Sequence, residues 1–358
     1  MSLLLYNLFL LIYQTGIRIA SFWNPKAAQW VQGRKQFPAF PTDRKTIWMH
    51  CSSLGEFEQG RPVLEALRER YPAYRVVLSF FSPSGYEIRK NYAGAEQVIY
   101  LPMDSAAHAR RLLDTMNPSL VIWVKYEYWH YYLQACRQRQ IPVWLVSAIF
   151  RPGQPFFKSY GSLWRNILRC FDQIFVQEPQ SAALLETIGC KMNVQVSGDT
   201  RFDRVAAIAD TAQPIAGIDA FVSGRPVLVA GSTWEEDEEE LVHYVKRHPE
   251  ICFILAPHEV DAVRLAEMRK TFPDAILYSK LTAPHPNEKT NVLIIDNIGM
   301  LSRLYRYADI TYVGGGFGDD GIHNTLEAAV YGKPVLFGPV YEKFAEARGL
   351  VACGGAFP

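Results

Sequence analysis

The sequence predicts an α/β protein of two doubly wound domains that follow a short apolar helix. Three observations support this: a chain of 358 residues, an uncharged segment at its start, and a regular alternation of patterns after Pro41. Domains usually hold roughly 100 to 200 residues, so this length predicts two of them. The alternation joins short β-branched or aromatic runs to longer amphipathic ones, and it predicts βαβ units with a parallel sheet covered on both faces.

Composition excludes several classes of protein. With 49% hydrophobic and 20% charged residues, the chain is neither disordered nor fibrous. The 37 basic and 36 acidic residues give a net charge of +1, which favours no nucleic-acid partner. The six cysteines form no C-x-x-C pair and no cluster with zinc spacing, so we expect reduced, mostly buried thiols and no metal site.

The first segment, residues 1–22, is predicted to be a membrane anchor. Residues 2–16 carry no charge, although Asn7 and Gln14 make the span a marginal one. A secretory signal is disfavoured because no basic residue precedes the run. A buried helix of the first domain stays as the alternative. Flanking residues fit an anchor that keeps the following chain in the cytoplasm: the interfacial Trp23 and Trp30 and the basic Arg18, Lys26, Arg34 and Lys35.

The first domain is predicted over 36–205. Its strands are expected at 46–50, 75–80, 97–101, 120–124, 143–148, 173–177 and 194–198. Stretches such as 62–71 and 106–116 repeat apolar residues at intervals of three and four, which indicates helices between the strands.

The second domain is predicted over 223–358, after a connection at 206–224 that is poor in charge. Its strands are expected at 226–231, 252–256, 291–296, 309–314 and 334–338. Few residues follow the last of these, so we expect a domain that is short at this end. Two such domains facing each other would bring the carboxyl ends of both sheets to a central cleft, the usual ligand position in open α/β sheets.

A first candidate site lies directly after the first strand, in CSSLGEFEQGRP at 51–62. The tight turn there brings the Glu56 carboxylate to the lip of the sheet, where it can take a proton from a hydroxyl group. The alternative is that Glu56 only complements the helix dipole. The two roles conflict, because a helix N-terminus lowers a carboxyl pKa while a general base benefits from a pKa near 7.

A second candidate site is GGGFGDDGIHNTLEAAVYG at 314–332, which predicts an anion-binding loop and helix N-terminus. Glu327 lies on the same helical face as Asn324 and could hold a ribose diol, or both residues could simply cap the helix. Gly316, Gly318 and Gly321 also match G-x-G-x-x-G. That motif falls in the last βα unit expected, which leaves too few strands for a dinucleotide fold.

Weaker features follow other strands. Ser232 and Thr233 offer hydroxyl donors before an acidic run that we expect to be a solvated helical turn. The segments 256–259 and 296–301 could contact a base or phosphate, and Arg201 could neutralise a leaving phosphate. Glu127, in the aromatic patch 126–132, could orient a sugar or tune Glu56, or it could be a satisfied carboxylate in a buried cluster. The aromatic and basic stretch 150–165 suits an anionic amphiphile or an irregular buried loop equally.

Taken together, these segments resemble one family. The apolar start, SSLGEFEQGRP, SPSGYE at 82–87, EYW at 127–129, GDTRFD at 198–203, GSTWEEDEE, DNIGML and GIHNTLEAA resemble the 3-deoxy-D-manno-octulosonic acid (Kdo) transferases that act on lipid A in lipopolysaccharide biosynthesis. The resemblance implies a GT-B fold, CMP-Kdo as donor, and metal-independent inverting transfer to the lipid A precursor (lipid IVA). It also implies the cytoplasmic face of the inner membrane, contact with membrane lipid through the anchor, and no further cofactor.

The resemblance also assigns residues. Glu56 would be the general base, Glu127 would be the second carboxylate of the site, and Arg201 would stabilise the departing CMP. Residues expected to hold the nucleotide are Ser232, Pro257, His258, Ile298, Gly299, Met300, Asn324, Thr325, Leu326 and Glu327.

Two departures from the family pattern matter. Lys125 stands where the family commonly has a first Glu, and the family continues beyond the equivalent of residue 358. Other functions stay open: an epimerase or hydrolase of sugar nucleotides with the same fold, a nicotinamide-dependent oxidoreductase built on the glycine loop, and a non-catalytic lipid-binding scaffold.

Overall fold

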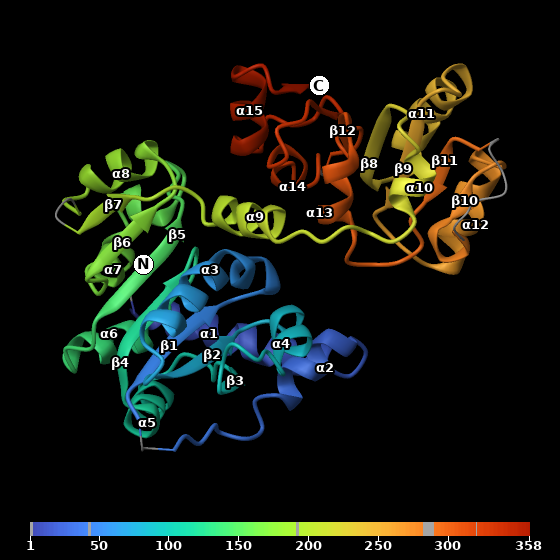
Figure 1. Ribbon diagram of the computed structural model, residues 1–358. Helices are drawn as coiled ribbons and strands as arrows, with labels where there is room; N and C mark the ends of the chain where they lie inside the picture. Colours follow the sequence, from blue (N-terminus) through green and yellow to red (C-terminus); the bar gives the residue numbers. More distant parts are fainter. Residues whose placement is uncertain (1–2, 42–43, 191–192, 282–289, 320) are drawn as a thin grey trace. The chain divides into compact units, whose positions relative to one another are not determined.

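The computed structural model describes residues 3–41, 44–190, 193–281, 290–319 and 321–358. The chain divides into two compact units, unit 1 (1–201) and unit 2 (202–358), which are coloured blue to green and yellow to red in Figure 1. Each unit is built on its own seven-stranded parallel sheet, so two doubly wound units, as predicted, are confirmed.

Unit 1 has the strand order β3-β2-β1-β4-β5-β6-β7. Its elements are α1 (Leu3–Ala20), α2 (Pro25–Gln32), β1 (Thr46–Cys51), α3 (Leu54–Arg70), β2 (Arg75–Phe80), α4 (Pro83–Arg89), β3 (Gln97–Tyr100), α5 (Ala106–Met116), β4 (Pro118–Val124), α6 (His130–Gln138), β5 (Val143–Ala148), η1 (Pro155–Phe157), α7 (Ser162–Leu168), β6 (Gln173–Val176), α8 (Pro179–Glu186), β7 (Val194–Val196) and α9 (Arg201–Asp210), which runs into unit 2.

The side chains of the central strand β1 point alternately toward the helices on the two faces of the sheet. All six of its residues are buried, because helices cover both faces of the sheet. Met49 packs with Phe57 of α3 on one face, and Trp48 packs with Leu112 of α5 on the other. β4 pairs with β1 in parallel, His50 opposite Trp123, so the carboxyl ends of the two strands lie side by side.

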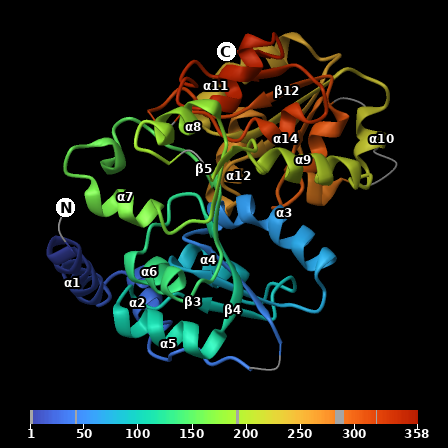
Figure 2. The same ribbon diagram turned by 90° about the vertical axis from the view of Figure 1, so that its left-hand side faces the viewer.

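Helix α1 is long and apolar enough to cross a membrane by length and composition, and it is the one such helix among the described residues. In the structure, however, it rests on unit 1 beside α2 and α6 (Figure 2). Tyr6 and Leu10 are buried in the core of the unit. The alternative, a buried helix of the first domain, therefore describes only the stripe of α1 that carries Tyr6 and Leu10, and the membrane anchor stays a prediction.

Two flanking residues of the predicted anchor have a different role from the one expected. Trp30 is buried in the core instead of lying at a membrane interface, whereas Trp23 is exposed. The Arg34 guanidinium donates to the carbonyls of Leu101 and Phe81 at 2.8 and 2.7 Å and covers the Trp30 ring at 3.9 Å. Burial lowers the pKa of Arg34 to about 9. Arg34 therefore fastens α2 to the sheet and contributes no charge to a membrane-facing cluster.

Unit 2 has the strand order β10-β11-β9-β8-β12-β13-β14. Its further elements are α10 (Ile218–Val222), β8 (Val227–Thr233), α11 (Glu235–Arg247), β9 (Cys252–Pro257), α12 (Ala262–Thr271), β10 (Ile276–Leu277), η2 (Tyr278–Lys280), β11 (Val292–Ile294), α13 (Leu301–Leu304), η3 (Tyr305–Tyr307), β12 (Ile310–Val313), α14 (Leu326–Ala329), β13 (Val335–Phe337), α15 (Ala345–Ala352) and β14 (Ala356–Phe357).

Unit 2 differs from the sequence prediction in two segments. Residues 206–224, expected to be a connection, contain the end of α9 and all of α10, because Ile218 and Phe221 pack into the core of unit 2. The last expected strand, β13, is followed by helix α15 and strand β14, and Val335 pairs with Ala356. The two-residue strands β10 and β14 are too short for a periodic pattern, so the sequence did not predict them.

We predict that Arg34→Met lowers the free energy of unfolding of unit 1 by about 3 kcal/mol, because it leaves buried carbonyl groups without a donor. Urea unfolding followed by tryptophan fluorescence measures this, since seven of the eight tryptophans precede residue 202. Arg70→Met removes an exposed arginine and serves as the control, with an expected change within about 0.5 kcal/mol. Equal stability of the two variants would contradict the structural role of Arg34.

Candidate active site

The first candidate site is built at the carboxyl ends of β1 and β4. Cys51 ends β1, Ser52 and Ser53 form the turn, and α3 begins at Leu54, which places Glu56 in its first turn. A Glu56 carboxylate oxygen accepts a short hydrogen bond from the Ser52 backbone N–H. Glu56 is partly buried, and this bond holds its carboxylate back toward the turn at the strand end.

The environment of Glu56 favours its protonated form. Burial and the charge of Glu127 raise the pKa of Glu56 to about 8, and the Ser52 N–H and the Lys125 ammonium oppose the rise without cancelling it. Burial therefore raises the pKa of Glu56 more than the helix N-terminus lowers it. A carboxyl group with such a pKa is a stronger base than an exposed glutamate once it has ionised.

Glu127 lies in the loop that follows β4 and is only 8% exposed. One of its oxygens accepts hydrogen bonds from His50 Nε2 at 3.1 Å and from the Trp129 indole N–H. His50, on β1, is fully buried, and its Nδ1 lies 2.8 Å from Ser79 Oγ on β2. Because a carboxylate only accepts, His50 Nε2 carries the proton, and burial lowers the pKa of the imidazole.

Glu127 is a satisfied carboxylate in a buried aromatic cluster, and its charge also raises the pKa of Glu56. The third interpretation, that Glu127 orients a sugar, stays a prediction. We had predicted neither His50, which donates to Glu127, nor Ser79, which contacts His50. Their only signal was that each is a polar residue inside an otherwise apolar strand.

Lys125, the residue that departs from the family pattern, has a left-handed backbone with φ of 66° at the end of β4. Its ammonium lies 5.3 Å from the centre of the Tyr126 ring, and its charge lowers the pKa of Glu56. Lys125 and Glu127 thus act on the same carboxyl group in opposite directions.

Arg201 is the last residue of unit 1 and begins α9. Its Nε and Nη2 both lie 2.7 Å from Asp199 Oδ2, and its backbone N–H donates to Asp199 Oδ1. The guanidinium is thus held in a defined orientation by Asp199, whose charge partly balances its own.

In the stretch 150–165, the aromatic residues Phe150 and Phe156 are buried and pack against each other at 5.6 Å between ring centres. Arg165 donates to the backbone carbonyls of Phe156 and Lys158. Much of the segment is therefore a structured loop with buried rings, while Tyr160 remains exposed.

In unit 2, an aromatic stack joins the ends of three strands. Trp234 follows β8, His258 follows β9, and His323 lies in the loop after β12. The rings of His258 and His323 stack at 4.2 Å, and the Trp234 ring lies 4.5 Å from that of His258. Trp234 Nε1 also donates to His323 Nε2 at 2.9 Å. Of the three, the sequence analysis had named only His258.

Ser232, the penultimate residue of β8, has a left-handed φ of 55°, and its carbonyl oxygen would lie 2.2 Å from a Cβ at Gly314. The close approach of β8 and β12 at this point therefore requires glycine. The neighbouring Thr233 is not a free donor, because it is fully buried and its hydroxyl donates to Glu238 at 2.8 Å.

The acidic run after β8 is solvated only in part, which corrects the sequence prediction. Asp237 is fully buried and accepts hydrogen bonds from the Tyr312 hydroxyl and the Gly315 backbone N–H. Glu238 is also buried and forms an ion pair with Arg264 at 2.6 Å. These two carboxylates tie α11 to the glycine loop and to α12.

The glycine loop does not lead directly into a helix. Gly315 forms an isolated antiparallel bridge with Ile322, and α14 begins only at Leu326 and has four residues. This separates the loop from a dinucleotide fingerprint, in which the glycines open a long helix at once. The expected phosphate site at a helix N-terminus therefore has only a short helix behind it.

Asn324 and Glu327 lie together, as the sequence predicted. The Asn324 amide donates to Glu327 at 3.4 Å and its oxygen accepts from the Leu326 N–H, an arrangement that caps α14. Burial raises the pKa of Glu327, whereas the charge of Arg204 lowers it. Thr325 and Leu326 are buried. Arg204, which the sequence analysis did not name, thus adds a cation to this corner of unit 2.

The remaining expected nucleotide contacts lie after β9 and β11. Pro257 ends β9 in the interior, and the His258 N–H donates to the Thr233 carbonyl at 3.0 Å. Gly299 has a left-handed φ of 94°, Ile298 is 86% exposed, and the buried Met300 offers its carbonyl to the start of α13. Among the described residues no hydrogen bond or ring contact joins this turn to the ring stack, although both lie at the carboxyl edge of the same sheet.

Within the described part of the chain, no group of three or more His, Cys, Asp or Glu side chains has the arrangement of a metal site. All six cysteines have free thiols, and only Cys353 is exposed.

The chain is similar to proteins of a known family. A family model described as 3-deoxy-D-manno-octulosonic-acid transferase (kdotransferase) matches residues 28–204. The chain is similar to the 3-deoxy-D-manno-octulosonic acid transferase of Bordetella pertussis, with 28% identity over 336 residues that cover 87% of this chain and 75% of the relative.

A longer relative is the bifunctional glycosyltransferase/methyltransferase of Fusobacterium nucleatum. It is 26% identical over 306 residues, which are 83% of this chain and 47% of the relative. The chain thus spans about half of the length of this relative.

The fold is shared with the UDP-GlcNAc 2-epimerase of Neisseria meningitidis bound to UDP-GlcNAc. The TM-score is 0.59 at 15% identity, and the match covers 87% of each chain. This likeness concerns the fold alone, and it confirms the predicted GT-B class at the level of two doubly wound units.

We predict that the Glu56 carboxyl group titrates at about pH 8 in the folded protein. Glu127→Gln removes a negative charge and lowers this pKa, whereas Lys125→Met removes a positive charge and raises it. Carbon NMR titration of the glutamate carboxyl signals, assigned with Glu56→Gln, measures all three values. Shifts in the same direction for the two variants would contradict the electrostatic account.

Proposed function

Because the chain belongs to the family of Kdo transferases, we propose that it transfers Kdo from CMP-Kdo to the lipid A precursor, lipid IVA, in lipopolysaccharide biosynthesis. The observation that supports this best is Glu56, a carboxylate at the carboxyl edge of the sheet whose pKa is raised to about 8. A group of this kind suits the deprotonation of a sugar hydroxyl.

The proposed reaction is a single displacement with inversion. Glu56 takes the proton of the acceptor hydroxyl while the oxygen of that hydroxyl forms a bond to the anomeric carbon of Kdo. The bond from that carbon to the phosphate oxygen breaks, and its electron pair leaves with CMP. Glu127 would be a positioning residue, since its charge keeps Glu56 basic while His50 and Trp129 hold it in place.

We assign the leaving CMP to cationic and stacking groups. Arg201, oriented by Asp199, would balance the charge that develops on the phosphate. In unit 2, His258 and the turn Ile298–Met300 would contact the nucleotide, and Glu327 would hold the ribose. The resemblance implies that no metal ion takes part, and helix α1 would keep the enzyme at the cytoplasmic face of the inner membrane.

The test is transfer from freshly made CMP-Kdo to a tetraacylated lipid A precursor in detergent, with EDTA present. We expect product from the wild type and a loss of at least about a hundredfold in Glu56→Gln, the scale of general-base catalysis. Glu69→Gln, an exposed glutamate on the same helix, should keep full activity. The wild-type rate should rise with pH through about 8, because only ionised Glu56 accepts a proton.

Binding experiments separate the other functions. Tight binding of CMP without transfer would refute the proposed reaction for this chain but would still support CMP-Kdo as its donor. Conversion of UDP-GlcNAc would favour an epimerase, and binding of NAD would favour the oxidoreductase.

A further inference from the structure

Helix α1 is fixed to unit 1 along one stripe. Tyr6, Leu10, Tyr13 and Ile17 recur at intervals of four and three and pack against the core. The Tyr6 hydroxyl donates to Asp104 Oδ2 at 2.6 Å, and Asp104 is nearly fully buried. Both groups at this contact are therefore removed from water.

The same contact also organises helix α6. Asp104 accepts the backbone N–H groups of Tyr131 and Tyr132 at 3.0 and 3.1 Å, and Tyr6 Oη accepts that of His130. The Tyr131 hydroxyl donates to Asn7 Oδ1 at 2.8 Å. If α1 left unit 1 to cross a bilayer, Asp104 would lose its hydroxyl donor and the core would be uncovered.

The opposite stripe of α1 is apolar and exposed. It contains Leu4, which is 77% exposed, together with Leu8, Leu11 and Ile19, and it continues into Phe22, which is 86% exposed. Apolar side chains on this scale rarely face water in a soluble protein. A helix with one side docked on protein and the other side apolar matches a helix that lies in the membrane interface.

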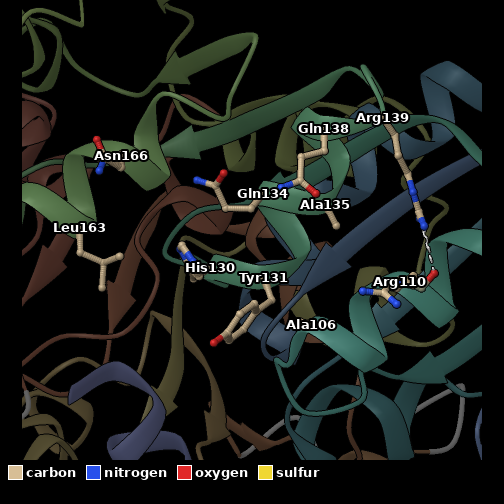
Figure 3. Close-up of a pocket in the computed structure, with 10 residues that line it drawn as sticks. All are labelled: Ala106, Arg110, His130, Tyr131, Gln134, Ala135, Gln138, Arg139, Leu163 and Asn166. Atoms are coloured by element: carbon tan, nitrogen blue, oxygen red, sulfur yellow. Dashed lines mark hydrogen bonds between the residues drawn. The ribbon is translucent and has the colours of Figure 1, made fainter. Parts of the chain in front are cut away.

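A polar groove opens beside the docked stripe, between α5, α6 and α7 (Figure 3). It holds about 530 Å³, and its polar lining residues are Arg110, His130, Gln134, Gln138, Arg139 and Asn166. The His130 ring meets that of Tyr6 edge to face at 5.8 Å, so the groove borders α1.

Two groups of this groove lack a partner within the described residues. The Arg110 side chain is exposed and forms no hydrogen bond or ion pair with the described residues, whereas Arg139 is held by Asp114 at 2.6 Å. The buried Nδ1 of His130 also has no hydrogen-bond partner. An uncompensated guanidinium in a polar groove suits an oxyanion such as a phosphate.

The sequence of α1 and of the segment after it carries charge of a single sign. The first 42 residues contain no Asp or Glu, and Arg18 and Lys26 are both exposed. Basic groups next to an interfacial helix favour a surface that contains anionic lipids. The groove and the apolar stripe together therefore match the two ends of one ligand, a phosphate and an acyl chain.

We propose that α1 lies in the plane of the bilayer, docked on unit 1, and that the groove beside it binds the headgroup phosphate of an anionic phospholipid. This rests on the membrane association proposed above and not on the chemistry of Kdo transfer. It can therefore be tested without donor or acceptor sugar.

Sedimentation with phosphatidylcholine vesicles, with or without phosphatidylglycerol, tests the groove. We expect Arg110→Gln to weaken binding to the anionic vesicles about fivefold, which corresponds to about 1 kcal/mol for one basic residue at the surface, and to leave binding to neutral vesicles unchanged. Arg70→Gln is the matched control, because it removes an exposed arginine from α3 on the other face of the sheet. Wild-type binding of Arg110→Gln to anionic vesicles would overturn the proposed headgroup site.

Depth measurements test the orientation of α1. In a Cys353→Ser background, where the other native thiols are buried, a fluorescent label on Leu4→Cys, Leu11→Cys or Ile19→Cys is quenched by spin-labelled lipids. An in-plane helix gives the same depth for all three labels. A spanning helix separates the first and last by about 22 Å along its axis and would overturn the proposed orientation. Transfer activity enters neither experiment, so a failure of the proposed reaction would leave both results interpretable.

Discussion

The pairing of β1 with β4 is the constraint from which the chemistry of unit 1 follows. Parallel neighbours end at the same edge of a sheet, so the segments that carry Glu56 and Glu127 must share a small volume. Two carboxylates in a partly buried place cannot both be ionised without cost. The structure resolves this by giving Glu127 two hydrogen-bond donors, His50 and Trp129, and by giving Glu56 a backbone N–H and a proton that leaves only near pH 8.

The sequence predicted what depends on local pattern. Alternating runs placed twelve strands within about two residues of their observed bounds, because a strand buried on both faces reads as an apolar run. The tight turn after β1 likewise predicted that Glu56 stands at a strand end. What it missed depends on distant pairs: Tyr6 meets Asp104 across 98 positions, and His50 meets Glu127 across 77. No local pattern contains such partners.

Charged residues were misjudged for the same reason. Arg34 seemed to belong to a basic flank, and Asp237 and Glu238 to a solvated helical turn, because charge in a sequence is normally a sign of exposure. Arg34 is partly buried, and Asp237 and Glu238 are buried, because a specific partner meets each of them: carbonyl groups for Arg34, Tyr312 for Asp237 and Arg264 for Glu238. Burial of a charge thus follows from the tertiary structure that supplies its partner.

Helix α1 and the candidate base are joined by a short series of contacts. Tyr13 of α1 packs on Phe81 at 6.0 Å, Phe81 packs on Trp129 at 4.7 Å, and Trp129 donates to Glu127. Glu127 in turn raises the pKa of Glu56. The five-residue turn that carries Glu127 also leads into the first turn of α6. There the Tyr131 backbone N–H donates to Asp104, which also accepts the Tyr6 hydroxyl of α1. The contacts that seat α1 on unit 1 therefore continue through Phe81 to Trp129, one of the two donors that hold Glu127 in position.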